Sequence, residues 1–229
     1  MNSPRILAII PARGNSKRIK NKNTKVIAGK PLIAWTIKSA LRSKFINEVY
    51  VSSDSKKILK ISKKFHAKTI VRPKILSGNV VMPDVAIKHA YLKLGKKFDY
   101  VVTLQATSPL RSNKQIDAAI KHIIKRKGDS LLSVFKSHTF LWKRNKNSFL
   151  PINYKLNKRP RSQDTKFYEE NGAIYITKPK ILTKKNNRLG GKILVYIMNK
   201  NDSNDIDNLD DFNIAEKLLK KKIKNKEIF

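Results

Sequence analysis

The chain has 229 residues, 40% of them hydrophobic, which allows one large domain with a sizeable core, and no apolar run is long enough to predict a membrane span or a signal peptide. It contains no cysteine, which excludes disulfide bonds and thiolate metal sites within these residues and fits a reducing cytoplasm. The formal charge of +35 suits a nucleic-acid or anionic-membrane binder, but the lysines are scattered over nearly every segment, which favours a general compositional bias.

Strands and helices alternate along the first 135 residues. The apolar run at residues 5–10 is continuous enough to be a strand buried on both faces. Further strands are expected at residues 49–51, 69–71, 100–104 and 130–135. Helices with one apolar face are expected at residues 31–41, 55–65, 83–94 and 115–124. This alternation predicts βαβ units and an α/β fold, with a mostly parallel sheet and flanking helices.

The alternation breaks between residues 137 and 168. This segment is polar, contains Pro151 and Pro160, and has isolated aromatic residues, which together predict an extended arm or a hairpin. The elements expected after it are two strands and an amphipathic closing helix, at residues 173–176, 193–197 and 209–219. We therefore expect residues 1–229 to form a single domain with one inserted arm.

A basic loop with a glycine follows the first predicted strand. In open parallel sheets, ligands bind beyond the carboxyl ends of the strands, and Gly14 there would let backbone N–H groups turn toward an anion. Arg13, Lys17 and Lys22 would add positive charge to neutralise a triphosphate. The spacing is neither a Walker loop nor a dinucleotide fingerprint, so an ordinary basic surface loop is the alternative.

Two aspartates flank Ile206 near the end of the chain. In an extended segment residues i and i+2 point to the same side, and two close carboxylates repel each other unless a cation lies between them. Because Mg²⁺ prefers oxygen ligands and bridges carboxylates to phosphates, we expect Asp205 and Asp207 to hold Mg²⁺. The alternative is loop solvation or helix capping, which is the role that we expect for Asp210 and Asp211.

A series of short motifs, taken in chain order, resembles the acylneuraminate cytidylyltransferases, the family of CMP-sialic acid synthetases. The motifs are IIPARGNSK at 9–17, Lys22-Asn23, GKPLIAWTI at 29–37, VSSD at 51–54, Arg72-Pro73, LQATSPLR at 104–111, NGAIY at 171–175 and DID at 205–207. Each motif alone is weak, but their joint order covers nearly the whole chain and is highly specific.

The resemblance implies a Rossmann-like nucleotidyltransferase fold and a cytoplasmic enzyme that transfers CMP from CTP to the anomeric hydroxyl of a nine-carbon 2-keto acid sugar, releasing pyrophosphate. For the nucleotide it implies Ala12, Arg13, Gly14, Ser16, Lys17, Lys22, Asn23 and Arg72. Among the catalytic residues it implies Arg13, Lys17, Lys22 and Asp207. For the sugar it implies Gln105, Arg161, Gln163 and Tyr175. It also implies a homodimer, in which residues 137–168 form the dimerisation arm and help to build the partner's active site.

The residues implied for the sugar also have ordinary structural roles open to them. A glutamine that ends a buried strand, such as Gln105, offers a donor and an acceptor to sugar hydroxyls, but it could equally satisfy a loop. Arg161 could clamp a carboxylate through two hydrogen bonds, or it could be a surface arginine in a basic arm. Tyr175 alternates with apolar neighbours and could be a half-buried residue of a sheet.

Two departures from the family pattern leave the exact sugar open. Asn79 stands where many members carry an aspartate, so we assign no role to that position. Residues 188–191, Arg-Leu-Gly-Gly, stand where sialic acid members can place an aromatic pair. Sialic, legionaminic and pseudaminic acids all remain possible, and Thr107-Ser108-Pro109 favours the first two. The rival functions are an eight-carbon KDO-type cytidylyltransferase, a basic nucleic-acid-binding protein without turnover, and an inactive scaffold.

Overall fold

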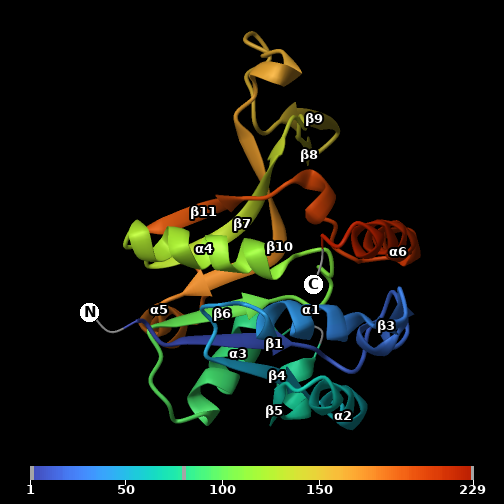
Figure 1. The fold of residues 1–229 in the computed structure, drawn as a ribbon. Coiled ribbons are helices and arrows are strands. Elements are labelled where there is room, and N and C mark those ends of the chain that lie inside the picture. Colours follow the sequence, from blue (N-terminus) through green and yellow to red (C-terminus); the bar gives the residue numbers. More distant parts are fainter. Residues whose placement is uncertain (1–2, 79–80, 228–229) are drawn as a thin grey trace.

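The computed structural model describes residues 3–78 and 81–227, so Asn79 lies outside the described residues. A seven-stranded sheet in the order β11-β7-β10-β6-β1-β4-β5 forms its centre (Figure 1). The strands are β1 Ile6–Pro11, β4 Glu48–Ser53, β5 Lys68–Val71, β6 Tyr100–Leu104, β7 Ser130–Ser137, β10 Phe167–Thr177 and β11 Ile193–Ile197. Every pairing in this sheet is parallel except those of β10 with β6 and β7. The predicted mostly parallel sheet is therefore confirmed.

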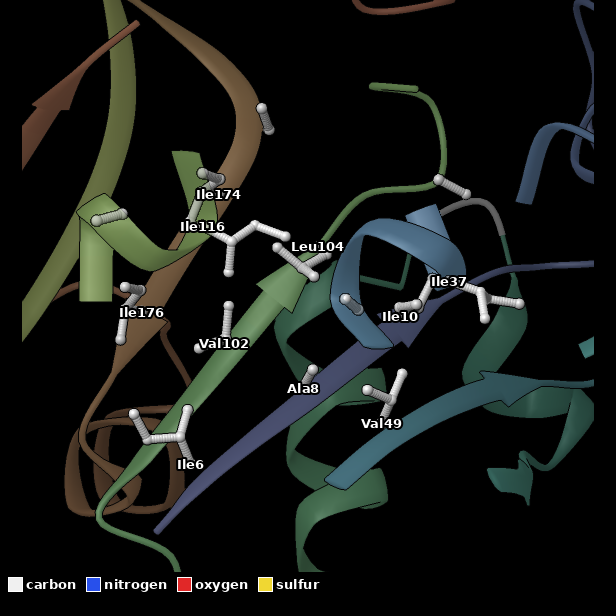
Figure 2. Packing of buried hydrophobic residues seen from close by; sticks show 14 of the residues in the cluster. Ile6, Ala8, Ile10, Ile37, Val49, Val102, Leu104, Ile116, Ile174 and Ile176 are labelled. Carbon is white, nitrogen blue, oxygen red and sulfur yellow. The ribbon is translucent and has the colours of Figure 1, made fainter. Parts of the chain in front are cut away.

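Helices cover both faces of the sheet. They are α1 Leu32–Leu41, α2 Lys56–Lys64, α3 Pro83–Lys93, α4 Asn113–Lys125, α5 Pro179–Lys185 and α6 Leu209–Lys224. Alternate residues of β1 explain this arrangement, because Ile6, Ala8 and Ile10 pack against α1, α2 and α4 (Figure 2). Leu7 and Ile9 belong to a separate cluster with residues of α3 and α5. Both faces of β1 are thus buried, which is why its sequence is apolar without a break.

A third apolar cluster joins distant parts of the chain at one end of the sheet. It contains Ile19 from the loop after β1, Trp35 from α1, and Phe212 from α6. Ile206, which lies between the two predicted metal-ligating aspartates, is fully buried in the same cluster. Burial of this isoleucine therefore brings the Asp205–Asp207 segment against the loop that follows β1.

An arm projects from the sheet between β7 and β10 (Figure 1). It carries an antiparallel hairpin of β8, Trp142–Asn145, and β9, Ser148–Pro151. Its aromatic residues Trp142 and Phe149 are 48% and 62% exposed. The irregular segment expected at 137–168 is thus an extended arm, and its role in dimerisation stays a prediction.

Two element boundaries differ from the expected ones. β10 begins at Phe167, six residues before the strand expected at 173–176, because its first part pairs with β7 along the base of the arm. The closing helix runs to Lys224, past the expected end at residue 219, along a lysine-rich turn that apolar periodicity does not mark. None of the described helices combines the length and the apolar character that crossing a bilayer requires.

Candidate active site

The loop after β1 is tied to the ends of its neighbours by backbone and side-chain hydrogen bonds. The Ala12 N–H group donates to the Ser52 carbonyl over 3.0 Å, and the Gly14 N–H group donates to Asp54 Oδ1 over 2.9 Å. The Asn23 side chain donates to the Arg13 carbonyl over 3.0 Å. The Ala12 and Gly14 N–H groups thus already have acceptors within the protein. These bonds fix the shape of the loop before any ligand binds.

Gly14 is required by close packing rather than by its backbone angle. A Cβ atom built on it would lie 2.8 Å from the Cβ atom of Ser55, well inside van der Waals contact. Ser55 cannot easily move, because its side chain caps the start of α2 by accepting from the Ile58 N–H group. The loop therefore passes directly over the beginning of α2, and only glycine fits there.

Arg72 follows β5 and is held beside this loop. One of its terminal nitrogens, Nη2, lies 3.8 Å from Asp54 Oδ1, and its Nε donates to Ser77 Oγ over 2.8 Å. Burial lowers the pKa of Arg72, and the negative charge of Asp54 opposes that shift. Asp54 thus links the glycine of the loop to a buried cation at the same edge of the sheet.

The Asp205–Asp207 segment reaches the other side of the same loop. The Ile206 N–H group donates to the Thr107 carbonyl over 3.0 Å, and the Ile206 carbonyl accepts from Lys22 Nζ over 2.5 Å. The Asp207 carboxylate lies 2.9 Å from Arg18 Nη1 and 3.8 Å from Lys22 Nζ. The basic loop and the paired aspartates, which are almost two hundred residues apart in sequence, are therefore direct neighbours.

Burial controls the ionisation of the two inner groups of this contact. It raises the pKa of Asp205, and repulsion from Asp207 adds to the rise, while Thr107, Lys22 and Ser108 oppose it. Burial also lowers the pKa of Lys22, and attraction to the two aspartates opposes that shift. A cation placed between the carboxylates would reduce the repulsion between them.

A cavity of about 720 Å³ opens between the loop, Arg72 and Asp207. The predicted site residues that line it are Arg13, Ser16, Lys17, Lys22, Asn23, Arg72, Gln105 and Asp207. Lysine and arginine side chains make one wall strongly basic, and Asp207 lines the same cavity. Such a cavity has the size and the charge to hold a polyanion such as a nucleoside triphosphate.

A second cavity of about 430 Å³ adjoins the first one. Gln105 lines both cavities, and the predicted residues Tyr175 and Asp205 line the second one. Gly172, at a bulge in β10, has a φ of +68°, and a Cβ atom there would lie 3.3 Å from Gln105 Nε2. A glycine at the bulge therefore gives the Gln105 amide its place between the two cavities.

Two of the predicted sugar-binding residues lie elsewhere. Arg161 and Gln163 are exposed in the arm, beside the short 3₁₀ turn η3, Ser162–Asp164, and line neither of the two cavities. The Arg161 side chain is 78% exposed, and its Nε lies 3.0 Å from Asp164 Oδ2. Because neither residue lines a cavity of this protomer, the sugar-binding role expected for them stays a prediction.

The acidic pair offers a suitable but incomplete set of ligands for a metal ion. Within residues 3–78 and 81–227, no group of three or more His, Asp or Glu side chains could hold a metal ion. Mg²⁺ commonly binds one or two carboxylates and completes its coordination with waters and substrate phosphates. Asp205 and Asp207, beside a cavity that suits a triphosphate, fit that pattern.

Two residues that support the site were not assigned by sequence reasoning. Asp54 directly follows β4, the strand beside β1, so its place at the carboxyl edge of the sheet was a usable signal. Arg111 is fully buried, and its Nη1 donates to the carbonyls of Gln105 and Ala173 over 3.3 and 2.7 Å. Burial lowers the pKa of Arg111 to about 9. Arg111 ends the motif at 104–111, but the motif does not indicate that its side chain is buried and joins the end of β6 to β10.

Comparison with known proteins identifies relatives of similar sequence. The N-acylneuraminate cytidylyltransferase A of Danio rerio is 36% identical over 219 residues, which are 93% of this chain and 50% of that protein. The CMP-N,N'-diacetyllegionaminic acid synthase of Legionella pneumophila is 34% identical over 233 residues, covering 94% of this chain and 96% of that protein. This chain thus spans about half the length of the first relative and nearly all of the second.

A solved structure shows the same fold at low sequence identity. A CMP:2-keto-3-deoxy-manno-octonic acid synthetase complexed with CTP superposes with a TM-score of 0.74 at 15% identity, covering 95% of this chain and 99% of that one. This similarity confirms the Rossmann-like nucleotidyltransferase fold. The sequence profile of the cytidylyltransferase family matches residues 7–227, which is almost the entire chain. This protein therefore belongs to the cytidylyltransferase family.

Proposed function

We propose that this protein transfers CMP from CTP to the anomeric hydroxyl of a nine-carbon 2-keto acid sugar and releases pyrophosphate. The observation that carries the proposal is that residues of the basic loop after β1 and Asp207 line the same cavity. The named relatives, which act on N-acylneuraminate and on a legionaminic acid, support a nine-carbon acidic sugar. We also propose a cytoplasmic location, where CTP is available.

In the proposed complex the triphosphate lies along the basic wall of the larger cavity. Arg13, Lys17 and Lys22 stabilise the negative charge that builds on pyrophosphate as it leaves. Ser16 and Asn23 line the same wall, and Arg72 faces the nucleotide from the end of β5. Catalysis is then mostly positioning and charge neutralisation, as in other phosphoryl transfers.

Asp205 and Asp207 are the residues that would hold Mg²⁺ in this reaction. When bound, the ion supplies charge neutralisation at the α-phosphate and makes the attacking hydroxyl easier to deprotonate. Ser108 Oγ lies 3.5 Å from Asp205 Oδ1 and helps to orient that carboxylate. The buried side chain of Ile206 holds the two aspartates beside the loop, because it packs in the same cluster as Ile19.

The sugar occupies the smaller cavity, next to the nucleotide. Gln105, which faces both cavities, donates and accepts hydrogen bonds at sugar hydroxyls beside the reacting phosphate. The Tyr175 hydroxyl donates a hydrogen bond to Glu170 Oε1, and both side chains line this cavity. Burial raises the pKa of Tyr175, which keeps its phenol protonated as a donor.

We further propose a homodimer formed through the arm. Apolar side chains of the arm, among them Leu141, Trp142 and Phe149, are exposed in the protomer, and such exposure is typical of a surface that another subunit covers. In that dimer Arg161 and Gln163 reach the active site of the partner subunit. Mixing an inactive Asp207→Ala subunit with an Arg161→Ala subunit would test this, because complementation restores activity only if the arm acts across the interface.

The proposed reaction can be tested with a two-way panel of substrates. Purified protein with Mg²⁺ is given CTP, UTP, ATP or GTP together with N-acetylneuraminic, legionaminic, pseudaminic or KDO acid, and released pyrophosphate is measured. We expect turnover with CTP and a nine-carbon acid. Preference for UTP or ATP would overturn the cytidine assignment, and preference for KDO would favour the eight-carbon alternative. Salt-sensitive DNA binding without pyrophosphate release would instead favour a nucleic-acid-binding protein.

The loop residues need a matched control, because the chain is so basic. Lys17→Ala should raise the KM for CTP or lower kcat, since Lys17 lines the larger cavity. Lys64→Ala removes an equal charge from the exposed end of α2 and should leave both constants unchanged. Equal behaviour of the two variants would remove Lys17 from the site.

A further inference from the structure

The smaller cavity has a charge distribution that conflicts with an acidic substrate. Of the residues that line it, Glu170 and Asp205 carry carboxylates, and none of the described lining residues is basic. A sugar carboxylate that entered this cavity would be repelled by both groups and would lose its hydration. A cation at the border of the cavity would offset this repulsion.

Arg188 is a cation placed at that border. Its Cζ atom lies 4.0 Å from the centroid of the Tyr175 ring, and Tyr175 lines the smaller cavity. Arg188 itself lines the larger cavity. The guanidinium group is therefore positioned between the space for the nucleotide and the space for the sugar. Gln105, which follows β6, also lies between these two spaces.

The protein holds Arg188 firmly by its backbone. The Arg188 N–H group donates to Asp84 Oδ1 over 2.8 Å, and the Arg188 carbonyl accepts from the Thr177 hydroxyl. Asp84 is itself buried in the first turn of α3. Arg188 Nε lies 3.8 Å from the same Asp84 oxygen, which is an ion pair but too long for a hydrogen bond.

One terminal nitrogen of Arg188, Nη1, is enclosed and has no hydrogen-bond partner among the described residues. A buried donor without an acceptor is destabilising, and a guanidinium edge matches a carboxylate through two parallel hydrogen bonds. Stacking on Tyr175 and the bonds to Asp84 restrict the group before the ligand arrives, which lowers the entropy lost on binding.

We propose that Arg188 binds the carboxylate of the acidic sugar within the same protomer and so determines the specificity for a 2-keto acid. This inference rests on the proposed function, because it requires the sugar to occupy the smaller cavity. The bound carboxylate would fix the anomeric carbon, to which it is attached, beside Gln105 and the nucleotide.

The test compares Arg188→Met and Arg188→Lys with the wild type in steady-state assays of pyrophosphate release. We expect Arg188→Met to raise the KM for N-acetylneuraminic acid about 10- to 100-fold and to leave the KM for CTP within about twofold. Arg188→Lys should recover only part of the loss, because an ammonium group lacks the planar edge. Lys184→Gln, which removes an exposed charge four residues earlier, is the matched control and should change neither constant.

A neutral substrate analogue separates recognition of the carboxylate from general packing damage. With the carboxamide of the same sugar, wild type and Arg188→Met should bind equally weakly. An equal loss for acid and carboxamide, an unchanged KM for the acid, or a rise in the KM for CTP instead would overturn the proposal. Arg161→Met in parallel shows whether the arm also contributes to binding the acid.

Calorimetric titration of the acid into the protein gives a second readout that needs no turnover. Binding to the wild type that is weakened in Arg188→Met would support the role of Arg188 even if no pyrophosphate were released, and only the proposed reaction would then fail. Absence of binding to the wild type, or binding that is the same in both proteins, would overturn the role of Arg188 itself.

Discussion

Replacing Gly172 with alanine tests how the bulge in β10 positions the active-site glutamine. Gly172 has a φ of +68°, and the new Cβ atom would lie 3.3 Å from Gln105 Nε2. That separation is shorter than an ordinary van der Waals contact, so the amide must shift by a few tenths of an ångström. Since Gln105 lines both cavities, we expect the shift to affect sugar binding as well as stability.

The size of the effect can be estimated with a second glycine as reference. Gly95, beyond the end of α3, has a φ of +59°, and a Cβ atom there would have no neighbour within 4 Å. A left-handed conformation costs a residue with a Cβ atom about 1–2 kcal/mol. In a protein of this size that corresponds to a fall in Tm of about 2–8 °C. Gly95→Ala should therefore show the backbone cost alone.

Gly172→Ala should show this backbone cost and an additional loss of function. We expect a similar or larger fall in Tm by differential scanning calorimetry, together with a rise of about tenfold in the KM for the sugar. Gly95→Ala should leave that KM unchanged. If Gly172→Ala kept the wild-type KM, or if both variants raised it equally, the bulge would have no part in placing Gln105.

Three further changes test other parts of the account. Asp54→Ala removes the acceptor of the Gly14 N–H group and the partner of Arg72, so the KM for CTP should rise about tenfold in steady-state assays, and an unchanged value would contradict this anchoring role. Glu48 is bonded to Lys68 and other donors, which lower its pKa from 4.5 to about 2. Because the folded-state pKa is depressed, its stabilisation is present above about pH 4.5 and is lost as the pH falls toward 2. Because Lys68 is exposed, Glu48→Gln should lower the free energy of unfolding in urea by only about 1 kcal/mol at pH 7. The loss should be smaller at pH 3, where the stabilisation by Glu48 is already reduced. Removal of divalent metal with EDTA should stop pyrophosphate release, and added Mg²⁺ should restore it; activity that survives chelation would contradict the metal assignment.

The sequence predicts most of the sheet because its strands are strongly apolar. β1 and β6 are buried on both faces, so their continuous hydrophobic runs identify them without any alignment. The early start of β10 escapes detection because Tyr168, Glu169 and Glu170 are exposed and their pairing with β7 leaves no apolar pattern. The arm also makes β10 antiparallel, because a hairpin-like connection returns the chain beside β7.

The candidate site is harder to predict from local sequence patterns than the fold. The loop residues and the paired aspartates could be identified by charge and spacing, but their contact depends on packing of Ile19, Ile206 and Phe212 in one cluster. Such long-range packing has no periodic signal in the sequence. The sequence indicates no binding role for Arg188 for a related reason, because it stacks on the ring of Tyr175 in β10 and its partner Asp84 is about one hundred residues earlier.

The most direct test of the central claim measures pyrophosphate release from CTP and N-acetylneuraminic acid in Asp207→Ala and Asp210→Ala. Asp207 lies on the rim of the larger cavity beside Lys22, whereas Asp210 is an exposed residue in the first turn of α6. If the loop and the paired aspartates act on one triphosphate, Asp207→Ala should abolish turnover while Asp210→Ala stays close to wild type. Full activity of Asp207→Ala would contradict the account.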